Sequence, residues 1–391
     1  MPDADGRITV AHVLEATAGG TRRYLLDACL GLPAERFAQT AIVSLERDPE
    51  FARDVEALEA GGVPVVVVPM VREVSPRRDL QALRELRSFF RDHPFDIIHA
   101  HSSKAGMLAR VAAWQAHNPA ARVYSPHAFA FTMAMGRPRR RLFRVLERLA
   151  GRITDLLVCT CESERALAVR HRIVPPWKAA VVRTGVDLRV FRPRGEGHRV
   201  REELGLPERH RLVGAVGALV EQKAHDLLIA AAPPVLEQMP HTTFVIVGSG
   251  PLEDELRARA AALGLGRRMV FLGRRDDVPQ LLDALDLFVM PSRWEGMPYA
   301  LIEAMAVGVP VVGSAIAGIV DVIEPGRTGR LAEPDSPADL ARAIVAALDE
   351  EGMSASMAQA GRDLVMREHS RERMLSTLAA LYERLVEDRP A

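Results

Sequence analysis

The segment that decides the interpretation of this chain is Pro291–Ala306, with the sequence PSRWEGMPYALIEAMA. The apolar run Leu287–Met290 just before it predicts a short buried strand. Ala300–Ala306 predicts a helix, which Gly308 and Pro310 end. The segment therefore joins a strand to a helix, as in sheets of parallel strands covered by helices.

Two carboxylates lie eight residues apart across this junction, Glu295 on the loop and Glu303 inside the helix. Because Gly296 and Pro298 open the helix, its first N–H groups and the positive end of its dipole face whatever binds there, which favours a pyrophosphate. We expect the carboxylates to contact neutral groups, Glu303 the hydroxyls of a ribose and Glu295 those of a hexose. The alternative is an acid near a helix start and a solvated helix glutamate, a pattern that many helices share.

Working outward, short apolar runs alternate with helical patterns such as Arg78–Phe90, which predicts two doubly wound α/β domains. A polar stretch with proline and glycine, Arg192–Gly197, marks a linker between them. The expected division is residues 1–190, a linker at 191–205, residues 206–370, and a last helix at 371–391. The predicted strands are Ile8–Leu14, Ala41–Val43, Val65–Val68, Ile97–Ile98, Val123–Tyr124, Leu156–Val158, Val181–Val182, Leu212–Val216, Phe244–Val247, Val270–Leu272, Leu287–Met290, Val309–Val312 and Gly329–Leu331.

The pair Glu295 and Glu303 resembles the E-x7-E signature of retaining glycosyltransferases, in particular glycosyltransferase family 4. The resemblance is strong from Leu212 to Leu331 and weaker over the first half of the chain. Further stretches follow in the family's order and spacing: Val216–Asp226, Val247–Pro251, Gly308–Val312, Gly318–Ile319 and Gly326–Gly329.

The resemblance implies the GT-B arrangement, in which two Rossmann-like domains face each other across a cleft. The N-terminal one is the acceptor domain, the second holds most of the sugar nucleotide, and the last helix packs back on the first. It implies a hexosyltransferase that moves a sugar from a nucleoside-diphosphate sugar to a glycan or lipid-linked acceptor with retention of anomeric configuration, in bacterial surface polysaccharide biosynthesis. No DxD-like acidic pair stands in a metal-binding context. The resemblance implies a metal-independent enzyme that needs no other cofactor.

Lys223 is the candidate cation for the leaving diphosphate, on which negative charge grows during glycosyl transfer. The matching family position touches the diphosphate. The family usually places an arginine directly after the glycine of this loop, but this chain has Ala218. Arg274 and Arg275 are the candidates to replace that arginine; without a replacement we expect weak turnover.

His127 follows a strand end in the first domain, and the matching family histidine reaches the donor sugar. We expect it to hydrogen-bond a sugar hydroxyl or the developing charge rather than to abstract a proton. The alternating His99 and His101 invite a metal, but without a third ligand at a useful spacing a structural or acceptor-side role is preferred. The catalytic candidates are thus Lys223, Glu295 and His127, and the donor-binding candidates are Gly19, Gly20, Gly217, Gly248, Gly250, Arg274, Gly296, Met297, Pro298, Tyr299 and Glu303.

The basic segment 137–152 carries an apolar stripe, formed by Leu142, Val145, Leu146 and Leu149. One interpretation is a helix on an anionic membrane or near a lipid-diphosphate acceptor. The other is that the stripe packs on the first domain and the arginines are solvated.

Composition limits the other classes. The net charge is zero, so no overall field attracts nucleic acid. The three cysteines are too few for a disulfide framework, and the start of the chain lacks the pattern of a secretory signal, so we expect a cytoplasmic protein, with peripheral membrane contact as an option.

Three other functions compete with this one. An NAD-dependent oxidoreductase is disfavoured because the glycine turns lack the G-x-G-x-x-G spacing. A glycoside hydrolase is disfavoured because its reaction would give no role to Lys223 or to a helix N-terminus suited to binding phosphate. A non-catalytic subunit that binds a sugar nucleotide stays open, because Ala218 replaces the usual arginine.

Overall fold

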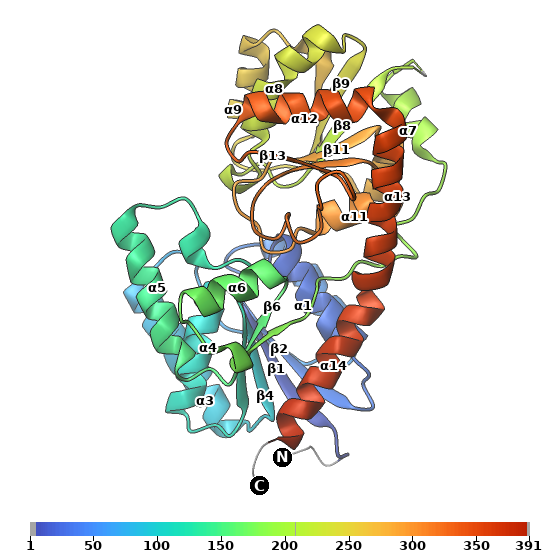
Figure 1. Cartoon of the computed structure of the whole chain (residues 1–391). Helices are drawn as coiled ribbons and strands as arrows, with labels where there is room; N and C mark the ends of the chain where they lie inside the picture. Colours follow the sequence, from blue (N-terminus) through green and yellow to red (C-terminus); the bar gives the residue numbers. More distant parts are fainter. Residues whose placement is uncertain (1–4, 208, 389–391) are drawn as a thin grey trace. The chain divides into compact units, whose positions relative to one another are not determined.

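A computed structural model describes residues 5–207 and 209–388 (Figure 1). The chain divides into two compact units. Unit 1 comprises the chain up to Thr184 together with the stretch from Glu372 onward, and unit 2 comprises Gly185–Arg371. The last helix therefore belongs to unit 1, although all of unit 2 precedes it along the chain.

Unit 1 is built on a parallel sheet, with seven strands among the described residues in the order β3-β2-β1-β4-β5-β6-β7. The strands are β1 (Ile8–Leu14), β2 (Phe37–Val43), β3 (Val65–Val67), β4 (Ile97–His101), β5 (Ala121–Ser125), β6 (Leu156–Cys159) and β7 (Ala179–Val181). The strand order reverses between β1 and β4, as in doubly wound sheets. Ligands of such sheets bind beyond the carboxyl ends of the strands, near this reversal.

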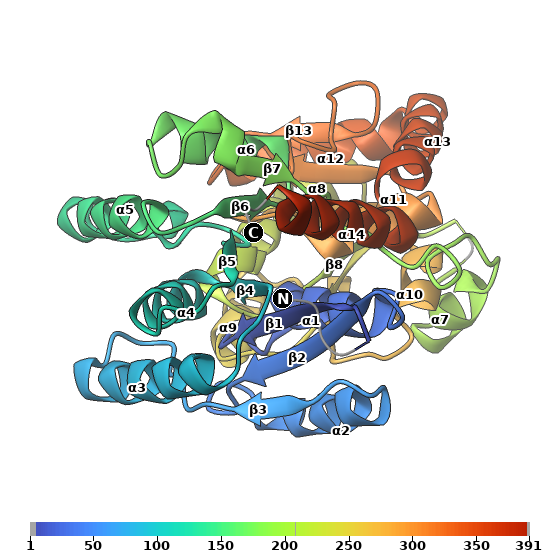
Figure 2. The ribbon, with the colours of Figure 1, turned by 90° about the horizontal axis from the view of Figure 1, so that it is seen from below.

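Helices cover both faces of this sheet (Figure 2). They are α1 (Gly19–Gly31), α2 (Ala52–Ala60), α3 (Pro76–Asp92), α4 (Ser103–Gln115), α5 (Arg137–Gly151), α6 (Glu162–Arg170) and α14 (Arg371–Glu387), with 3-10 turns η1 (Pro49–Phe51), η2 (Ala130–Thr132) and η3 (Pro176–Lys178). The alternation of β1 explains the two layers: Val10 and Leu14 pack on the side of α1, whereas Ala11 and Val13 pack on the side of α3 and α4.

Unit 2 is built on a second parallel sheet, with the order β10-β9-β8-β11-β12-β13 in the described part. Its strands are β8 (Arg211–Val216), β9 (Thr242–Val247), β10 (Met269–Gly273), β11 (Leu287–Met290), β12 (Val311–Ser314) and β13 (Arg330–Ala332). Here the order reverses between β8 and β11, the two strands that precede the Lys223 loop and the Glu295 loop.

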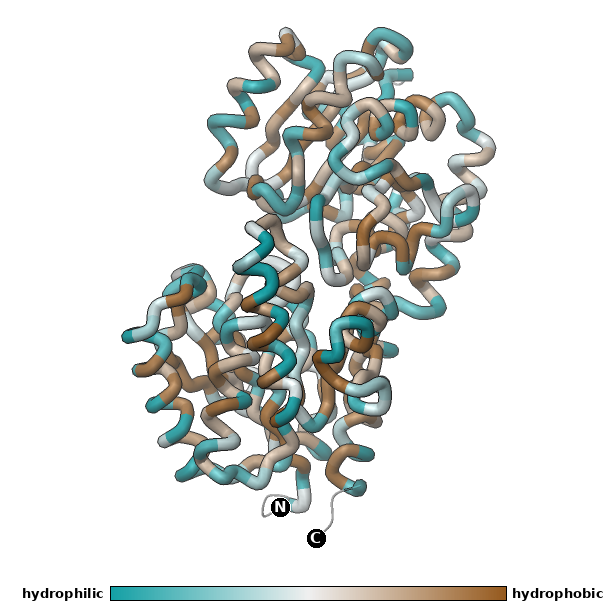
Figure 3. Tube along the Cα trace, turned by 60° about the vertical axis from the view of Figure 1, so that its left-hand side comes forward, coloured by the Kyte–Doolittle hydropathy of each residue, from teal (hydrophilic) through white to brown (hydrophobic). Residues whose placement is uncertain are grey.

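The helices of unit 2 also lie on both faces of its sheet. They are α7 (Gly197–Glu203), α8 (His225–Gln238), α9 (Glu253–Ala262), α10 (Val278–Ala284), α11 (Tyr299–Val307), α12 (Pro337–Asp349) and α13 (Glu351–Glu368), with η4 (Glu221–Lys223) and η5 (Gly266–Arg268). Leu228 of α8 and Ile344 of α12 share one buried core with Phe244 of β9. Hydrophobic and polar residues alternate along the helical turns of the trace in Figure 3, as expected for helices with one face on a core.

The predicted fold class, two α/β domains with doubly wound parallel sheets, is confirmed. Every predicted strand has a counterpart, and several extend further because pairing continues through polar residues such as Gln39 and His101. The segment 191–205, predicted as a linker, contains α7, which packs against α10 within unit 2. Among the described residues, none of the helices combines the length and the apolar character needed to cross a membrane.

Helix α14 completes the core of unit 1. Met374, Leu378 and Tyr382 are buried in one cluster with Val10 of β1 and Ile97 of β4. This face of the sheet is therefore covered by a helix that is distant in sequence. Tyr382 of α14 contacts His99 of β4, which lies 283 residues earlier in the chain. The hydroxyl of Tyr382 lies 2.5 Å from His99 Nδ1.

A buried ion pair attaches α5 to the rest of unit 1. Arg110 and Glu147 lie 3.3 Å apart, and their side chains are 1% and 4% exposed. The guanidinium also donates to the Gly106 carbonyl and to Thr154 Oγ1, and it stacks on the ring of Tyr124, whose hydroxyl donates to Glu147. Because all the charged atoms are hydrogen-bonded, removal of one partner leaves a buried charge uncompensated.

We expect Glu147→Ala to lower the free energy of unfolding by about 3–5 kcal/mol in urea denaturation of the full chain. The control is Glu46→Ala, because Glu46 pairs with Arg78 where the two side chains are 44% and 61% exposed. Loss of such an exposed pair costs at most about 1 kcal/mol. Equal destabilisation by both substitutions would contradict the role given to the buried pair.

Candidate functional site

Lys223 and Glu295 meet at the carboxyl edge of the unit 2 sheet. Lys223 Nζ lies 2.7 Å from Glu295 Oε1, and the side chains are 21% and 6% exposed. Gln222 Nε2 donates to the other carboxylate oxygen at 3.1 Å. The ammonium is therefore held in place by a carboxylate that is itself nearly buried, and one side of the lysine stays accessible.

Glycines bring the surrounding loops into backbone contact. A Cβ on Gly217 would lie 3.2–3.4 Å from the Lys223 stem, so the lysine crosses this residue. A Cβ on Gly248, whose φ is +137°, would lie 2.0 Å from the Gly217 carbonyl, and one on Gly250 would lie 2.6 Å from the Leu219 carbonyl. Gly248 and Gly250 are thus required for loop packing, because their neighbours are backbone atoms. The predicted loops are brought together around Lys223.

The turn before α11 is packed in the same way. A Cβ on Gly318, with φ +82°, would lie 1.6 Å from the Gly296 carbonyl. Met297 and Pro298 are buried, and Pro298 occupies the N-cap position of α11. Tyr299 begins α11, and Glu303 lies within it with 6% exposure. Gly308 adopts the left-handed conformation that ends α11, as its sequence predicts.

An ion-pair network anchors the two loops to each other. Arg293 donates to both carboxylate oxygens of Asp226 and to Asp335, and its side chain also reaches the Glu221 carbonyl. The Arg293 backbone N–H donates to the Gln222 carbonyl. The Glu295 loop after β11 is therefore fixed against the Lys223 loop after β8.

Of the two arginines proposed to replace the missing one, Arg275 has another task. Its guanidinium contacts Glu203 of α7 and Asp277 at the start of α10. Arg274 is exposed directly after β10, and Ala218 is exposed on the Lys223 loop.

In unit 1, Gly19 and Gly20 are exposed at the start of α1, and Gly19 has φ +66°. Tyr24 of the same helix packs edge-on against His127, with ring centroids 4.8 Å apart. His127 follows β5 and is half-buried. Burial lowers its pKa to about 4, so the imidazole is neutral at pH 7.

A third histidine, His12, lies beside His99 and His101. The sequence did not predict this neighbour. It lies on β1 in register with His99, and one ring nitrogen from each of the three side chains lies within 4.8 Å of the other two. Each of their six ring nitrogens is already in a hydrogen bond, to Gln39, His101, His127, Ser125 or Tyr382. A metal ion would have to break these bonds, so the residues fit a hydrogen-bond network better than a metal centre.

Two family models match the chain. The model for "Glycosyl transferase 4-like domain" matches residues 19–185, and the model for "Glycosyl transferases group 1" matches residues 198–364. The UDP-Gal:alpha-D-GlcNAc-diphosphoundecaprenol alpha-1,3-galactosyltransferase of Escherichia coli is 32% identical over 356 residues, which cover 90% of each chain. The chain belongs to the group 1 glycosyltransferases.

Other relatives and solved structures agree with this assignment. The D-inositol 3-phosphate glycosyltransferase of Salinispora arenicola (strain CNS-205) is 32% identical over 289 residues, which cover 68% of this chain and 64% of the relative. Anabaena HepE, solved with UDP and glucose, has a TM-score of 0.80 at 21% identity and covers 96% of this chain and 100% of its own. WaaG, a glycosyltransferase involved in lipopolysaccharide biosynthesis, has a TM-score of 0.75 at 19% identity, with 95% and 99% covered. These similarities establish the GT-B fold.

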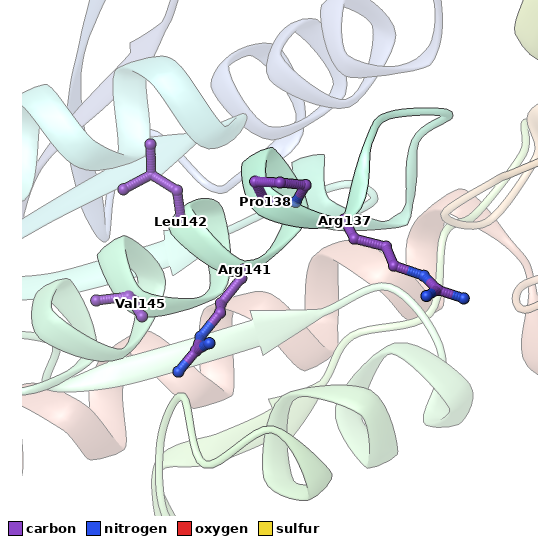
Figure 4. A pocket seen from close by; sticks show the side chains of 5 residues that line it. All are labelled: Arg137, Pro138, Arg141, Leu142 and Val145. Atoms are coloured by element: carbon purple, nitrogen blue, oxygen red, sulfur yellow. The ribbon is translucent and has the colours of Figure 1, made fainter.

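Helix α5 of the glycosyltransferase exposes the stripe identified in the sequence. Leu142, Val145, Leu146 and Leu149 are 56%, 42%, 37% and 50% exposed. The side that faces unit 1 is instead formed around Glu147 and Ala150, which are buried. Figure 4 shows a groove on this helix, lined by Arg137, Pro138, Arg141, Leu142 and Val145. The interpretation in which the stripe packs on the first domain is therefore wrong.

Several residues of these sites escaped the sequence analysis. Gln222 contacts Glu295, Arg293 contacts Gln222 and Asp226, and Gln39 contacts His12. These partners are distant in sequence, so the sequence does not show the pairing. His12 did carry a signal, because it is a polar residue inside the apolar run of β1. A histidine fully buried in such a run indicates a partner across the sheet.

The pKa values of His12, His127 and His225 make stability depend on pH. Burial is the first cause in each case, and it lowers each pKa to about 4 from the usual 6.5. Between these values the unfolded chain binds a proton that the folded protein excludes, so the free energy of unfolding rises with pH from 4 to 6.5 and levels off above. Acidification from pH 7 to pH 5 should cost on the order of 2 kcal/mol per histidine.

Urea denaturation at pH 7 and pH 5 measures this loss. His12→Gln removes one buried histidine. The decrease in the free energy of unfolding between pH 7 and pH 5 should therefore be smaller by the contribution of that histidine. An unchanged loss in that variant would show that His12 does not exclude the proton.

Proposed function

We propose that this glycosyltransferase moves a hexose from a UDP-sugar to a sugar carried on a lipid diphosphate, with retention of anomeric configuration. The observation that carries the proposal is the Lys223–Glu295 pair at the carboxyl edge of the unit 2 sheet, with the N-terminus of α11 following Glu295. The solved structure of Anabaena HepE with UDP-glucose has the same fold and supports UDP as the nucleotide.

Lys223 is assigned to the leaving diphosphate. Cleavage of the anomeric C–O bond places negative charge on a phosphate oxygen, and a fixed ammonium stabilises that charge without reorganisation. Glu295 holds the ammonium at 2.7 Å before the donor binds. When phosphate oxygens take over Lys223, the carboxylate is available to accept hydrogen bonds from hexose hydroxyls.

The packing of unit 2 supports the other donor-binding assignments. Gly217, Gly248 and Gly250 lie in loops whose backbones approach each other closely. Gly296 lies in the turn that precedes α11. Arg274 supplies the second positive charge. Met297, Pro298 and Tyr299 form the start of α11, and Glu303 is assigned to the ribose hydroxyls.

No metal ion is required by this proposal. Lys223 and the positive end of α11 supply the charge that a divalent cation provides in other transferases. Retention is assigned to attack on the face from which the diphosphate leaves, with a phosphate oxygen of the donor taking the acceptor proton. The acceptor class is suggested by the Escherichia coli relative, whose printed name contains GlcNAc-diphosphoundecaprenol.

Lys223→Ala tests the assignment. Loss of one charge-assisted hydrogen bond to the leaving diphosphate removes roughly 1.5–3 kcal/mol, so kcat/KM for UDP-galactose should fall about 10- to 150-fold. Affinity for UDP, measured by calorimetry, should fall as well. The control is Lys178→Ala, because Lys178 lies in unit 1 and donates to the Thr154 carbonyl.

Two outcomes would contradict the proposal. If Lys223→Ala binds UDP and transfers sugar like the parent protein, the ammonium does not hold the diphosphate. If the parent protein binds UDP-sugars without transfer and Glu295→Gln changes nothing, the chain is a binding subunit.

We also propose that α5 contacts an anionic membrane. Its exposed stripe would bury apolar surface among the lipids, and Arg141 and Arg148 lie three or four residues from Val145, next to the stripe. A charged edge beside an exposed apolar stripe is typical of helices that lie in a membrane interface. Such a contact would bring the enzyme to lipid-linked acceptors.

Vesicle flotation tests this contact. The parent protein should float with phosphatidylglycerol vesicles and not with phosphatidylcholine vesicles. Leu142→Glu with Leu149→Glu should reduce the bound fraction at least about tenfold, since each buried leucine contributes roughly 1.5–3 kcal/mol. The control is Leu80→Glu with Leu263→Glu, since both leucines are 45% exposed elsewhere. The contact would be refuted if the bound fraction were the same for both kinds of vesicle, or if the α5 substitutions left it unchanged.

A further inference from the structure

Three hydrogen bonds join four side chains of unit 1 in a row: Gln39, His12, His101 and His127. Gln39 Oε1 lies 3.1 Å from His12 Nε2, His12 Nδ1 lies 3.1 Å from His101 Nε2, and His101 Nδ1 lies 3.1 Å from His127 Nε2. Gln39, His12 and His101 are buried, and His127 is half-buried at the end of the row. The row is called the histidine relay below.

Gln39 sets the direction of the histidine relay. Its Nε2 donates to the Cys29 carbonyl at 2.8 Å, so its Oε1 faces His12. An amide oxygen only accepts hydrogen bonds. The proton between Gln39 and His12 therefore sits on His12 Nε2.

The tautomer of each ring in the row is fixed by its hydrogen bond to the preceding ring. Burial lowers the pKa of His12 and His127 to about 4 and that of His101 well below its usual value, so all three rings are neutral at pH 7. A neutral ring with Nε2–H has a lone pair on Nδ1. His12 Nδ1 thus accepts from His101 Nε2–H, and His101 Nδ1 accepts from His127 Nε2–H.

His99 does not disturb this order. Ser125 Oγ donates to the Val158 carbonyl, so it can only accept from His99 Nε2–H. His99 Nδ1 then accepts from the Tyr382 hydroxyl. Both nitrogens of His99 are used, and the ring stays outside the histidine relay.

The backbone holds His127 in one orientation. His127 and Ala128 both have positive φ, 51° and 99°, which costs energy in residues with a Cβ. The Ala128 N–H donates to Glu164 at 2.8 Å, and Glu164 also accepts from the Thr160 N–H. Within the described part of the chain no side chain or backbone group hydrogen-bonds His127 Nδ1.

We propose that the histidine relay makes His127 present a lone pair at Nδ1, so that it accepts a hydrogen bond from a sugar hydroxyl and selects a hydroxyl-bearing substrate group. Gln39, His12 and His101 are positioning residues that act through His127. This assignment rests on the proposed transfer reaction. A phosphate or carbonyl oxygen at the same place would face a lone pair and be repelled.

Two substitutions at Gln39 separate the histidine relay from simple packing. Gln39→Met keeps the length of the side chain but removes the acceptor. His12 can then carry its proton on Nδ1, which reverses every bond and turns a His127 N–H toward the substrate. In Gln39→Glu a protonated carboxyl group reproduces the amide, because its O–H donates to Cys29 and its C=O accepts from His12.

Long-range 15N–1H correlation NMR of 15N-histidine-labelled protein at pH 7 identifies which nitrogen of His127 is protonated. We expect Nε2–H in the parent protein and in Gln39→Glu, and protonated or mixed Nδ1 in Gln39→Met. The control Gln81→Met, in which an exposed glutamine on α3 is replaced, should not change the spectrum. Protonated Nδ1 in the parent protein, or an unchanged tautomer in Gln39→Met, overturns the proposal.

Kinetics with UDP-galactose provide the second measurement. Gln39→Met should lose about 5- to 30-fold in kcat/KM, and Gln39→Glu should lose less. UDP affinity should stay the same, because UDP is assigned to unit 2. If the parent protein turns over no UDP-galactose, the proposed donor fails, while the NMR result still decides the histidine relay.

Discussion

Parallel pairing of strands is the constraint on which both candidate sites depend. In a parallel sheet every strand ends at the same edge, so the loops that follow them gather there. In unit 2 this edge collects Lys223 after β8, Gly248 after β9 and Glu295 after β11. In unit 1 it collects His101 at the end of β4 and His127 after β5. Residues that are distant in sequence become neighbours without any special local pattern.

The candidate sites of the two units differ in charge. In unit 2 a lysine and a glutamate are kept close together with one side accessible, which suits a site that must stabilise a leaving anion. In unit 1 four histidines lie close together and burial keeps them neutral, so their mutual contacts are hydrogen bonds between uncharged rings. The first arrangement places a charged group at the sheet edge, and the second places neutral donors and acceptors there.

Glycine packing makes the unit 2 site rigid. The Gly217 carbonyl lies too close to Gly248, and the Gly296 carbonyl too close to Gly318, for a Cβ on Gly248 or Gly318. Arg293 adds a second constraint, since it bridges the two loops that carry Lys223 and Glu295. Groups held in this way need little reorganisation when a ligand binds, and such preorganisation is what lets fixed charges stabilise a developing charge.

The sequence by itself determined the fold class, the order of the strands along the chain, the Glu295–Glu303 spacing and the Gly308 stop of α11, because periodicity, glycines and helix ends are local properties. Even the exposed stripe of α5 was visible as a pattern, although its exposure was not. Only the tertiary structure decided that Lys223 meets Glu295, that Arg275 is engaged elsewhere, and that His12 and Gln39 lead to His127. The physical reason is that a buried polar group takes its partner across the sheet, where strand register and packing, rather than neighbours in sequence, choose the contact.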